Sequence, residues 1–132
     1  MTESIALIIE DDTRLGNILE IVLHQAGFIT QVINDGAEAL AYLATGTPSI
    51  ILLDLHLPSV SGVEILRHIR ADNRLASVPI IVVTADLNLA QSIKAQVDHV
   101  LFKPMSVASL RTIAAKLHPD TPDTPDTVTP TS

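Results

Sequence analysis

The chain has 132 residues, of which 47% are hydrophobic and 17% charged, so it suits one globular domain and is too apolar for an intrinsically disordered protein. Eight basic against 15 acidic residues give a net charge of −7, and only 2% of residues are aromatic, so direct binding to nucleic acid is not expected. The chain lacks cysteine, a targeting signal and any apolar run of ~20 residues, so we expect a cytoplasmic protein without disulfides, thiolate metal sites or membrane contact.

Five short aliphatic runs alternate with segments of helical periodicity. The runs predict strands at 5–9, 28–33, 50–53, 79–83 and 97–102. The first, third and fourth are continuously apolar, which is typical of parallel strands covered by helices on both faces.

The segments between the strands have apolar residues spaced for one face of a helix. They predict helices at about 15–26, 36–45, 61–69, 87–95 and 107–117. Gly27 is placed to end the first helix, whereas Asp35, Ser61 and Ser106 are placed to cap the starts of the second, third and fifth. Five such alternating units predict an α/β fold, a doubly wound parallel sheet with helices on both faces.

Polar residues follow the predicted strands directly, at the sheet edge where ligands bind in such folds. They are Glu10, Asp11 and Asp12 after the first strand, Asp54 after the third, Thr84 after the fourth and Lys103 after the fifth. Each has a simpler explanation, since Asp12 or Thr13 is expected to cap the first helix, Thr84 could be a loop hydroxyl and Lys103 a surface charge. Their occurrence together, in this order, favours a functional site.

The converging carboxylates predict a magnesium site, because they repel one another unless a hard cation neutralises them. Asp54 could then act as a nucleophile toward a phosphoryl group and form an aspartyl phosphate. Lys103 would bind a phosphoryl oxygen through its charge, and the Thr84 hydroxyl would donate a hydrogen bond to another.

Four segments carry a resemblance to a known family: IIEDD at 8–12, LLDLHLP at 52–58 with Ser61-Gly62 after it, VVTA at 82–85 and FKPM at 102–105. With them the chain resembles the receiver domains of bacterial two-component response regulators from about residue 5 to 117. The resemblance implies a flavodoxin-like fold with strand order 2-1-3-4-5.

The resemblance also implies roles for single residues. Asp54 would be the phosphoacceptor, Asp11 a direct Mg²⁺ ligand, Glu10 a ligand through water, and the main-chain carbonyl of His56 a third ligand. Thr84 would be the switch hydroxyl and Lys103 the phosphoryl-binding lysine. A cis peptide bond between Lys103 and Pro104 is expected, as in many family members.

The implied function is a phosphoacceptor switch that catalyses its own phosphorylation and dephosphorylation rather than an enzyme acting on a metabolite. A sensor histidine kinase or phosphotransfer protein would donate the phosphoryl group, and the signal would pass to a separate target protein. We expect residues 1–117 to be the receiver domain and 118–132, rich in Pro, Asp and Thr, to be a disordered tail. No output domain is expected after it, although a piece of a longer regulator would look identical, and the oligomeric state is left open.

Alternatives remain at this point. One is a phosphorelay intermediate. Another is a hydrolase of the haloacid-dehalogenase type, whose motif needs a second Asp where this chain has His56. An FMN-binding module shares the fold but would need a less acidic first loop.

The chain departs from the family pattern at Val100, three residues before Lys103, where many members have an aromatic residue. We therefore expect signalling through the loop after Thr84 and repacking of the fourth helix and fifth strand. His56 and Asp86 occupy the positions that tune the lifetime of the phosphoryl group in this family, and His99 is expected to have no role.

Overall fold

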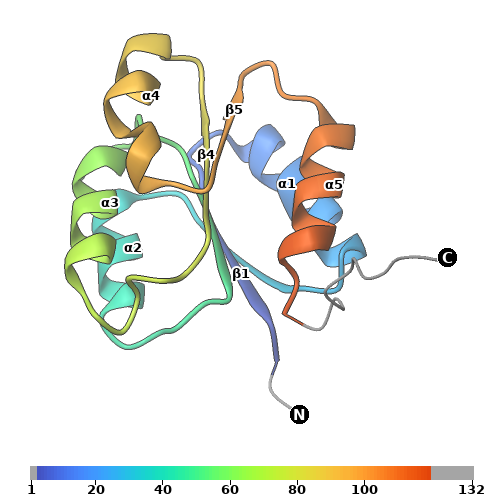
Figure 1. Ribbon diagram of the computed structural model, residues 1–132, viewed down its shortest axis with the longest axis horizontal. Helices are drawn as coiled ribbons and strands as arrows, with labels where there is room; N and C mark the ends of the chain where they lie inside the picture. The colour runs from blue at the N-terminus through green and yellow to red at the C-terminus, as the bar shows by residue number, and fades with distance from the viewer. Residues whose placement is uncertain (1–2, 120–132) are drawn as a thin grey trace, which may run out of the picture.

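The computed structural model describes residues 3–119, which form one sheet with helices on both faces (Figure 1). The strands are β1 (Ile5–Ile9), β2 (Ile29–Ile33), β3 (Ile50–Leu53), β4 (Ile80–Thr84) and β5 (His99–Phe102). The α-helices are α1 (Thr13–Gln25), α2 (Gly36–Leu43), α3 (Gly62–Ala71), α4 (Leu87–Ile93) and α5 (Val107–Leu117), and a 3₁₀ turn, η1 (Lys94–Gln96), follows α4.

All strand pairs are parallel, and their order is β2-β1-β3-β4-β5. The expected fold and strand order are therefore confirmed. The direction of winding changes between β1 and β3, which pair directly with Ile9 opposite Leu53. Glu10 and Asp54, the next residues of the two strands, consequently meet at the carboxyl edge of the sheet, where the Asp54 N–H donates to the Ile9 carbonyl at 3.0 Å.

The core consists of two apolar layers, one on each face of the sheet. Side chains of β1 alternate between them, with Leu7 and Ile9 in the layer under α2 and α3 and Ala6 and Ile8 in the layer under α1 and α5. Figure 1 shows α1 and α5 on one side of the strands and α2, α3 and α4 on the other. The three central strands are almost fully buried, as their uninterrupted apolar sequences predict, whereas the edge strands β2 and β5 are partly exposed.

Several elements are shorter than predicted, most clearly around β5. Its ladder begins at His99 rather than at residue 97, because the Asp98 side chain accepts the hydrogen bond of Ile80 N at 2.8 Å and regular pairing starts only afterwards. The α-helix before it ends at Ile93 and continues as the 3₁₀ turn η1. β4 begins at Ile80, one residue after Pro79, which has no N–H to donate.

The end of α5 packs against the start of β2. The His118 ring packs against Phe28 at an interplanar angle of 60°, with ring centroids 4.7 Å apart, and His118 Nε2 is 3.0 Å from the Gly27 carbonyl. Residues 120–132 lie outside the described part of the chain, so the disordered tail stays a prediction for them. None of the helices in residues 3–119 has the length and apolar character needed to cross a membrane.

Candidate functional site

Three polar side chains are buried at the carboxyl edge of the sheet. Glu10 is 2% exposed, Asp54 5% and Thr84 0%. Burying a carboxylate or a hydroxyl is unfavourable unless it gains a partner, so partners for these groups are expected nearby.

Asp54 uses both of its carboxylate oxygens. Oδ1 accepts a hydrogen bond from His56 N at 3.1 Å, and Oδ2 accepts one from Lys103 Nζ at 3.1 Å. The first helical turn of α3 packs tightly behind it, because a Cβ atom on Gly62 would lie only 2.2 Å from the Asp54 carbonyl oxygen. Hydrogen bonds therefore hold the Asp54 carboxylate, and α3 packs against the Asp54 main chain.

Lys103 reaches the acidic residues from β5. Its N–H donates to the Thr84 carbonyl at 2.9 Å, and its peptide bond to Pro104 is cis, as expected. Nζ lies 3.2 Å from Glu10 Oε1 and 3.1 Å from Asp54 Oδ2. Burial alone would lower the pKa of the Lys103 ammonium, but its hydrogen bond to Asp54 and the charges of both carboxylates outweigh burial and raise the pKa above its usual range.

Glu10 is the carboxyl group of this site whose pKa is raised most clearly. Burial raises the pKa of its carboxyl group from 4.5 to about 7, with the hydrogen bond from Asp12 N opposing the rise and the charge of Asp54 adding to it. Oε1 is buried and has no hydrogen-bond partner among the described residues, since its 3.2 Å contact with Lys103 Nζ is ionic without hydrogen-bond geometry. Oε1 is thus paired by charge with Lys103 while its capacity to accept a hydrogen bond is unused.

Asp11 completes an acidic cluster. One oxygen each from Glu10, Asp11 and Asp54 lie within 4.8 Å of one another, and Asp11 is exposed to solvent. Three carboxylates face one nearby ammonium, so a hard cation with oxygen ligands fits both the donor set and the excess of negative charge.

The Thr84 hydroxyl stands at the end of β4. Its Oγ1 accepts a hydrogen bond from Asp86 N at 3.1 Å, so the hydroxyl can still donate its own hydrogen. Glu10, Asp11, Asp54 and Lys103 are therefore in contact or close together at the carboxyl edge of the sheet, and Thr84 ends the neighbouring strand β4 at the same edge.

Comparison with known proteins agrees with this arrangement. The family model of the response regulator receiver domain matches residues 6–115. The chain belongs to this family.

Relatives of this receiver domain include a DNA-binding response regulator and a chemotaxis protein. The DNA-binding response regulator MtrA of Mycobacterium tuberculosis is 36% identical over 107 residues, which are 79% of this chain and 46% of MtrA. The chain thus spans about half the length of that relative. The chemotaxis protein CheY-3 of Vibrio cholerae is 32% identical over 109 residues, 80% of this chain and 84% of CheY-3.

Solved structures of receiver domains are also similar. The receiver domain of the sensor histidine kinase PA1611 of Pseudomonas aeruginosa is 28% identical, with a TM-score of 0.78, and the match covers 88% of this chain and 98% of that one. That structure has a magnesium ion coordinated in its active-site cleft.

The receiver domain has a further contact, between the side chains of a histidine and an aspartate, that sequence analysis missed. His56 Nε2 lies 3.1 Å from Asp86 Oδ2, while Asp86 Oδ1 caps α4 by accepting from Leu89 N at 2.9 Å. These contacts hold the pKa of the Asp86 carboxyl group below its usual range, the Leu89 N–H contributing most. The two partners are 30 residues apart, so only their positions beside the site hinted at a shared role.

The predicted caps are confirmed. Asp12 Oδ1 accepts from Leu15 N at 3.1 Å and caps α1, so it does not join the acidic cluster. The side chains of Asp35, Ser61 and Ser106 cap α2, α3 and α5.

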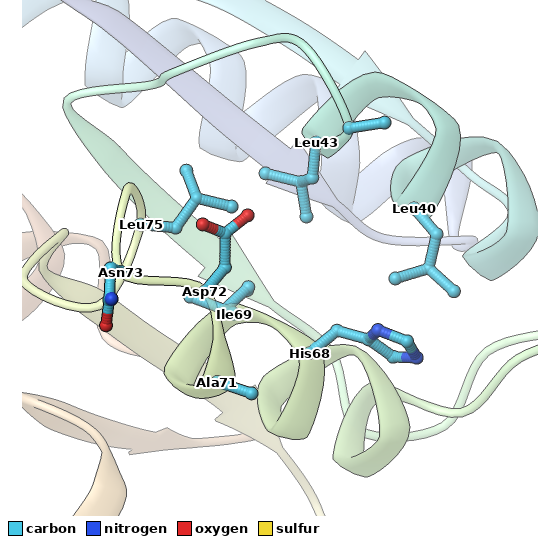
Figure 2. Close-up of a pocket in the computed structure, with 9 residues that line it drawn as sticks. Leu40, Leu43, His68, Ile69, Ala71, Asp72, Asn73 and Leu75 are labelled. Carbon is cyan, nitrogen blue, oxygen red and sulfur yellow. The ribbon is translucent and has the colours of Figure 1, made fainter.

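A hollow of about 710 Å³ lies away from this site, between α2 and α3 (Figure 2). Leu40 and Leu43 line it from α2, and Ile69 and Leu75 line it from α3 and the segment that follows. None of the acidic cluster, Thr84 or Lys103 contributes to its wall, so it is no part of the phosphoryl chemistry.

Proposed function

We propose that this chain is a magnesium-dependent phosphoacceptor that receives a phosphoryl group on Asp54 from a phosphohistidine of a sensor kinase or phosphotransfer protein. The observation that supports this most directly is the contact between Lys103 Nζ and Asp54 Oδ2 at 3.1 Å, beside two further carboxylates. A buried aspartate with a fixed cation and an adjacent acidic cluster is suited to receive a phosphoryl group and to stabilise its charge.

Magnesium fits the residues present. The carboxylates of Glu10, Asp11 and Asp54 and the main-chain carbonyl of His56 would hold it, and Glu10 Oε1, which accepts no hydrogen bond among the described residues, is consistent with that role. When bound, the ion would offset negative charge on the phosphoryl oxygens.

The chain's own residues divide the rest of the work. An Asp54 carboxylate oxygen forms the new bond to phosphorus while the phosphorus–nitrogen bond of the donor histidine breaks, and the imidazole takes the electron pair. Lys103 then holds a phosphoryl oxygen by charge, and the Thr84 hydroxyl donates to another. Attack of water on the phosphorus later returns the Asp54 carboxylate and inorganic phosphate.

The signal would leave through the segment that Thr84 touches. The Asp86 N–H bonded to Thr84 Oγ1 belongs to the residue that caps α4, so movement of the hydroxyl toward a phosphoryl oxygen disturbs the start of that helix. We propose that a separate target protein recognises the resulting change in α4 and β5. The haloacid-dehalogenase and FMN alternatives are set aside because the chain belongs to the receiver family.

Intact-mass measurement after incubation with Mg²⁺ and acetyl phosphate tests the proposal. We expect one phosphoryl adduct that hydroxylamine removes, that EDTA prevents, and that is absent from Asp54→Asn. Asp98→Asn serves as a matched control, because Asp98 is an aspartate outside the acidic cluster. The absence of an adduct on the parent protein, or an equal adduct on Asp54→Asn, would contradict the proposal.

A further inference from the structure

The loop between β3 and α3 carries both the proposed phosphoacceptor and a proposed metal ligand. It starts at Asp54, includes the His56 carbonyl proposed as a metal ligand, and ends at the α3 cap Ser61. His56, Pro58 and Ser59 are exposed, so packing alone does not fix this part of the loop. Leu57 and Val60 pack against the apolar core, and hydrogen bonds to neighbouring elements add to this packing in holding the loop.

One such attachment joins the loop to the start of α2. The Ser59 hydroxyl donates to Asp35 Oδ1 at 2.8 Å and accepts from Ala37 N at 3.1 Å. Asp35 Oδ2 accepts from Glu38 N at 3.0 Å, so one carboxylate both caps α2 and holds the loop. The pKa of Asp35 lies below its usual range because of the Glu38 N–H first and the Ser59 hydroxyl second.

The backbone at this attachment is unusual. Ser59 has φ of 64°, the only positive value at a non-glycine residue in the described part of the chain. Such a conformation is unfavourable for serine, and it persists where surrounding contacts impose it. Close packing agrees with this, since the Gly36 N–H donates to the Pro58 carbonyl at 3.2 Å and a Cβ atom on Gly36 would lie 1.9 Å from the Val60 carbonyl oxygen.

We propose that Asp35 and Ser59 are positioning residues for phosphoryl transfer, which hold the β3–α3 loop so that its main chain can complete the magnesium site beside Asp54. This inference rests on the proposed function. Neither side chain reaches the acidic cluster, so their effect passes through the loop.

The local contacts predict that loss of the Ser59 attachment weakens Mg²⁺ binding. Ser59 is three residues from His56, and the segment between them is anchored at one end by His56 N on Asp54 Oδ1 and at the other by the Ser59 hydroxyl. Releasing the Ser59 end lets the main chain sample more conformations, so binding an ion there costs more conformational entropy. If the whole free energy of one such hydrogen bond is coupled to binding, its loss weakens Mg²⁺ binding by about ten-fold at most.

Four variants separate the attachment from other effects. Ser59→Gly removes the hydroxyl while allowing positive φ, and Ser59→Asn keeps both a donor and an acceptor on a residue type that tolerates this conformation. Asp35→Ser keeps an N-cap of similar quality on a side chain too short to reach Ser59. Ser77→Gly, at an exposed serine before β4, is the control for a serine-to-glycine change elsewhere.

Two quantities are measured. NMR titration of the protein with Mg²⁺, without a phosphodonor, gives the dissociation constant of the ion, and hydrogen exchange gives the protection of His56 N. We expect weaker Mg²⁺ binding and faster exchange in Ser59→Gly and Asp35→Ser, with parent values in Ser59→Asn and Ser77→Gly. Parent affinity and parent exchange in Ser59→Gly would overturn the positioning role and leave the proposed function standing. A parent protein without a phosphoryl adduct on Asp54 would overturn both.

Discussion

Glu10 shows how the fold changes the chemistry of one residue. The side chain is 2% exposed, and burial raises its pKa from 4.5 to about 7, so this carboxyl group keeps its proton to a higher pH than an exposed glutamate does. Sequence analysis identified Glu10 as acidic and adjacent to a strand, but the rise in pKa comes first from burial and then from Asp54, 44 positions away, while the charge of Lys103, 93 positions away, opposes it. Such a shift cannot be inferred before the three residues are placed together.

Glu10 predicts a particular pH dependence of stability without metal. Because its folded pKa is above its unfolded value, the folded state holds the proton more tightly, and this stabilisation is complete below about 4.5 and lost as the pH rises to about 7. The free energy of unfolding should fall by about 3 kcal/mol at most over this range. Urea unfolding in EDTA at a series of pH values measures it.

The matched control for that experiment is Glu10→Gln, which keeps the shape of the side chain and cannot lose a proton. Its stability should be flatter than that of the parent between pH 4.5 and 7, and the difference between the two curves isolates Glu10. Added Mg²⁺ should stabilise the parent increasingly as the pH rises through this window, because the ion competes with the proton. Identical slopes for parent and variant would show that Glu10 does not titrate there.

The elements of the fold follow closely from local sequence signals. Helix starts are the best predicted, because Asp35, Ser61 and Ser106 accept the backbone hydrogen bonds that their types and positions indicate. Helix and strand ends are less well predicted where a distant residue decides them. Arg74 donates to the Leu43 and Gly46 carbonyls at the end of α2, which stops at Leu43 rather than at the predicted residue 45.

Gly62, with Gly16 as its control, tests how closely α3 packs against β3. A Cβ atom at Gly62 would lie 2.2 Å from the Asp54 carbonyl oxygen and 2.6 Å from Leu55 Cα, so the backbone must move. We expect Gly62→Ala to lower the free energy of unfolding by about 1–3 kcal/mol and to shift the Asp54 and His56 amide resonances.

Gly16 in α1 is the control, because a Cβ atom there would meet only Val32 Cγ1, at an ordinary 3.6 Å. Gly16→Ala should leave the Asp54 resonances unchanged and raise stability by up to about 1 kcal/mol through helix propensity. Equal stability of Gly62→Ala and the parent would mean that α3 can retreat from β3 at no cost. Chemical denaturation with NMR of the folded state distinguishes these outcomes.

Across the whole molecule, the residues that meet at the carboxyl edge of the sheet can be predicted from sequence, whereas the hydrogen bonds between its loops cannot. Residues that directly follow strands meet at one edge because parallel strands share a direction, so Asp11, Asp54 and Lys103 could be grouped from sequence. The attachments of Ser59 to Asp35 and of His56 to Asp86 cross 24 and 30 residues between loops. Their polar side chains have many local partners available in the sequence, so spacing carries no signal for them.

These loop attachments bear on how the site communicates with α4 and β5, given that Val100 replaces the usual aromatic residue. Thr84 Oγ1 now accepts from Asp86 N, and a phosphoryl oxygen would compete for the orientation of that hydroxyl. We therefore predict that a beryllofluoride complex of the protein, a stable phosphoryl mimic, changes amide shifts across α4 and β5. Thr84→Val should still bind the mimic at Asp54 but lose most of the α4 shifts, whereas Thr84→Ser, which keeps a hydroxyl, should retain them. If α4 responds equally in Thr84→Val, the signal reaches α4 by another route. The contact between His56 and Asp86 is the next candidate for that route, and His56→Ala removes it.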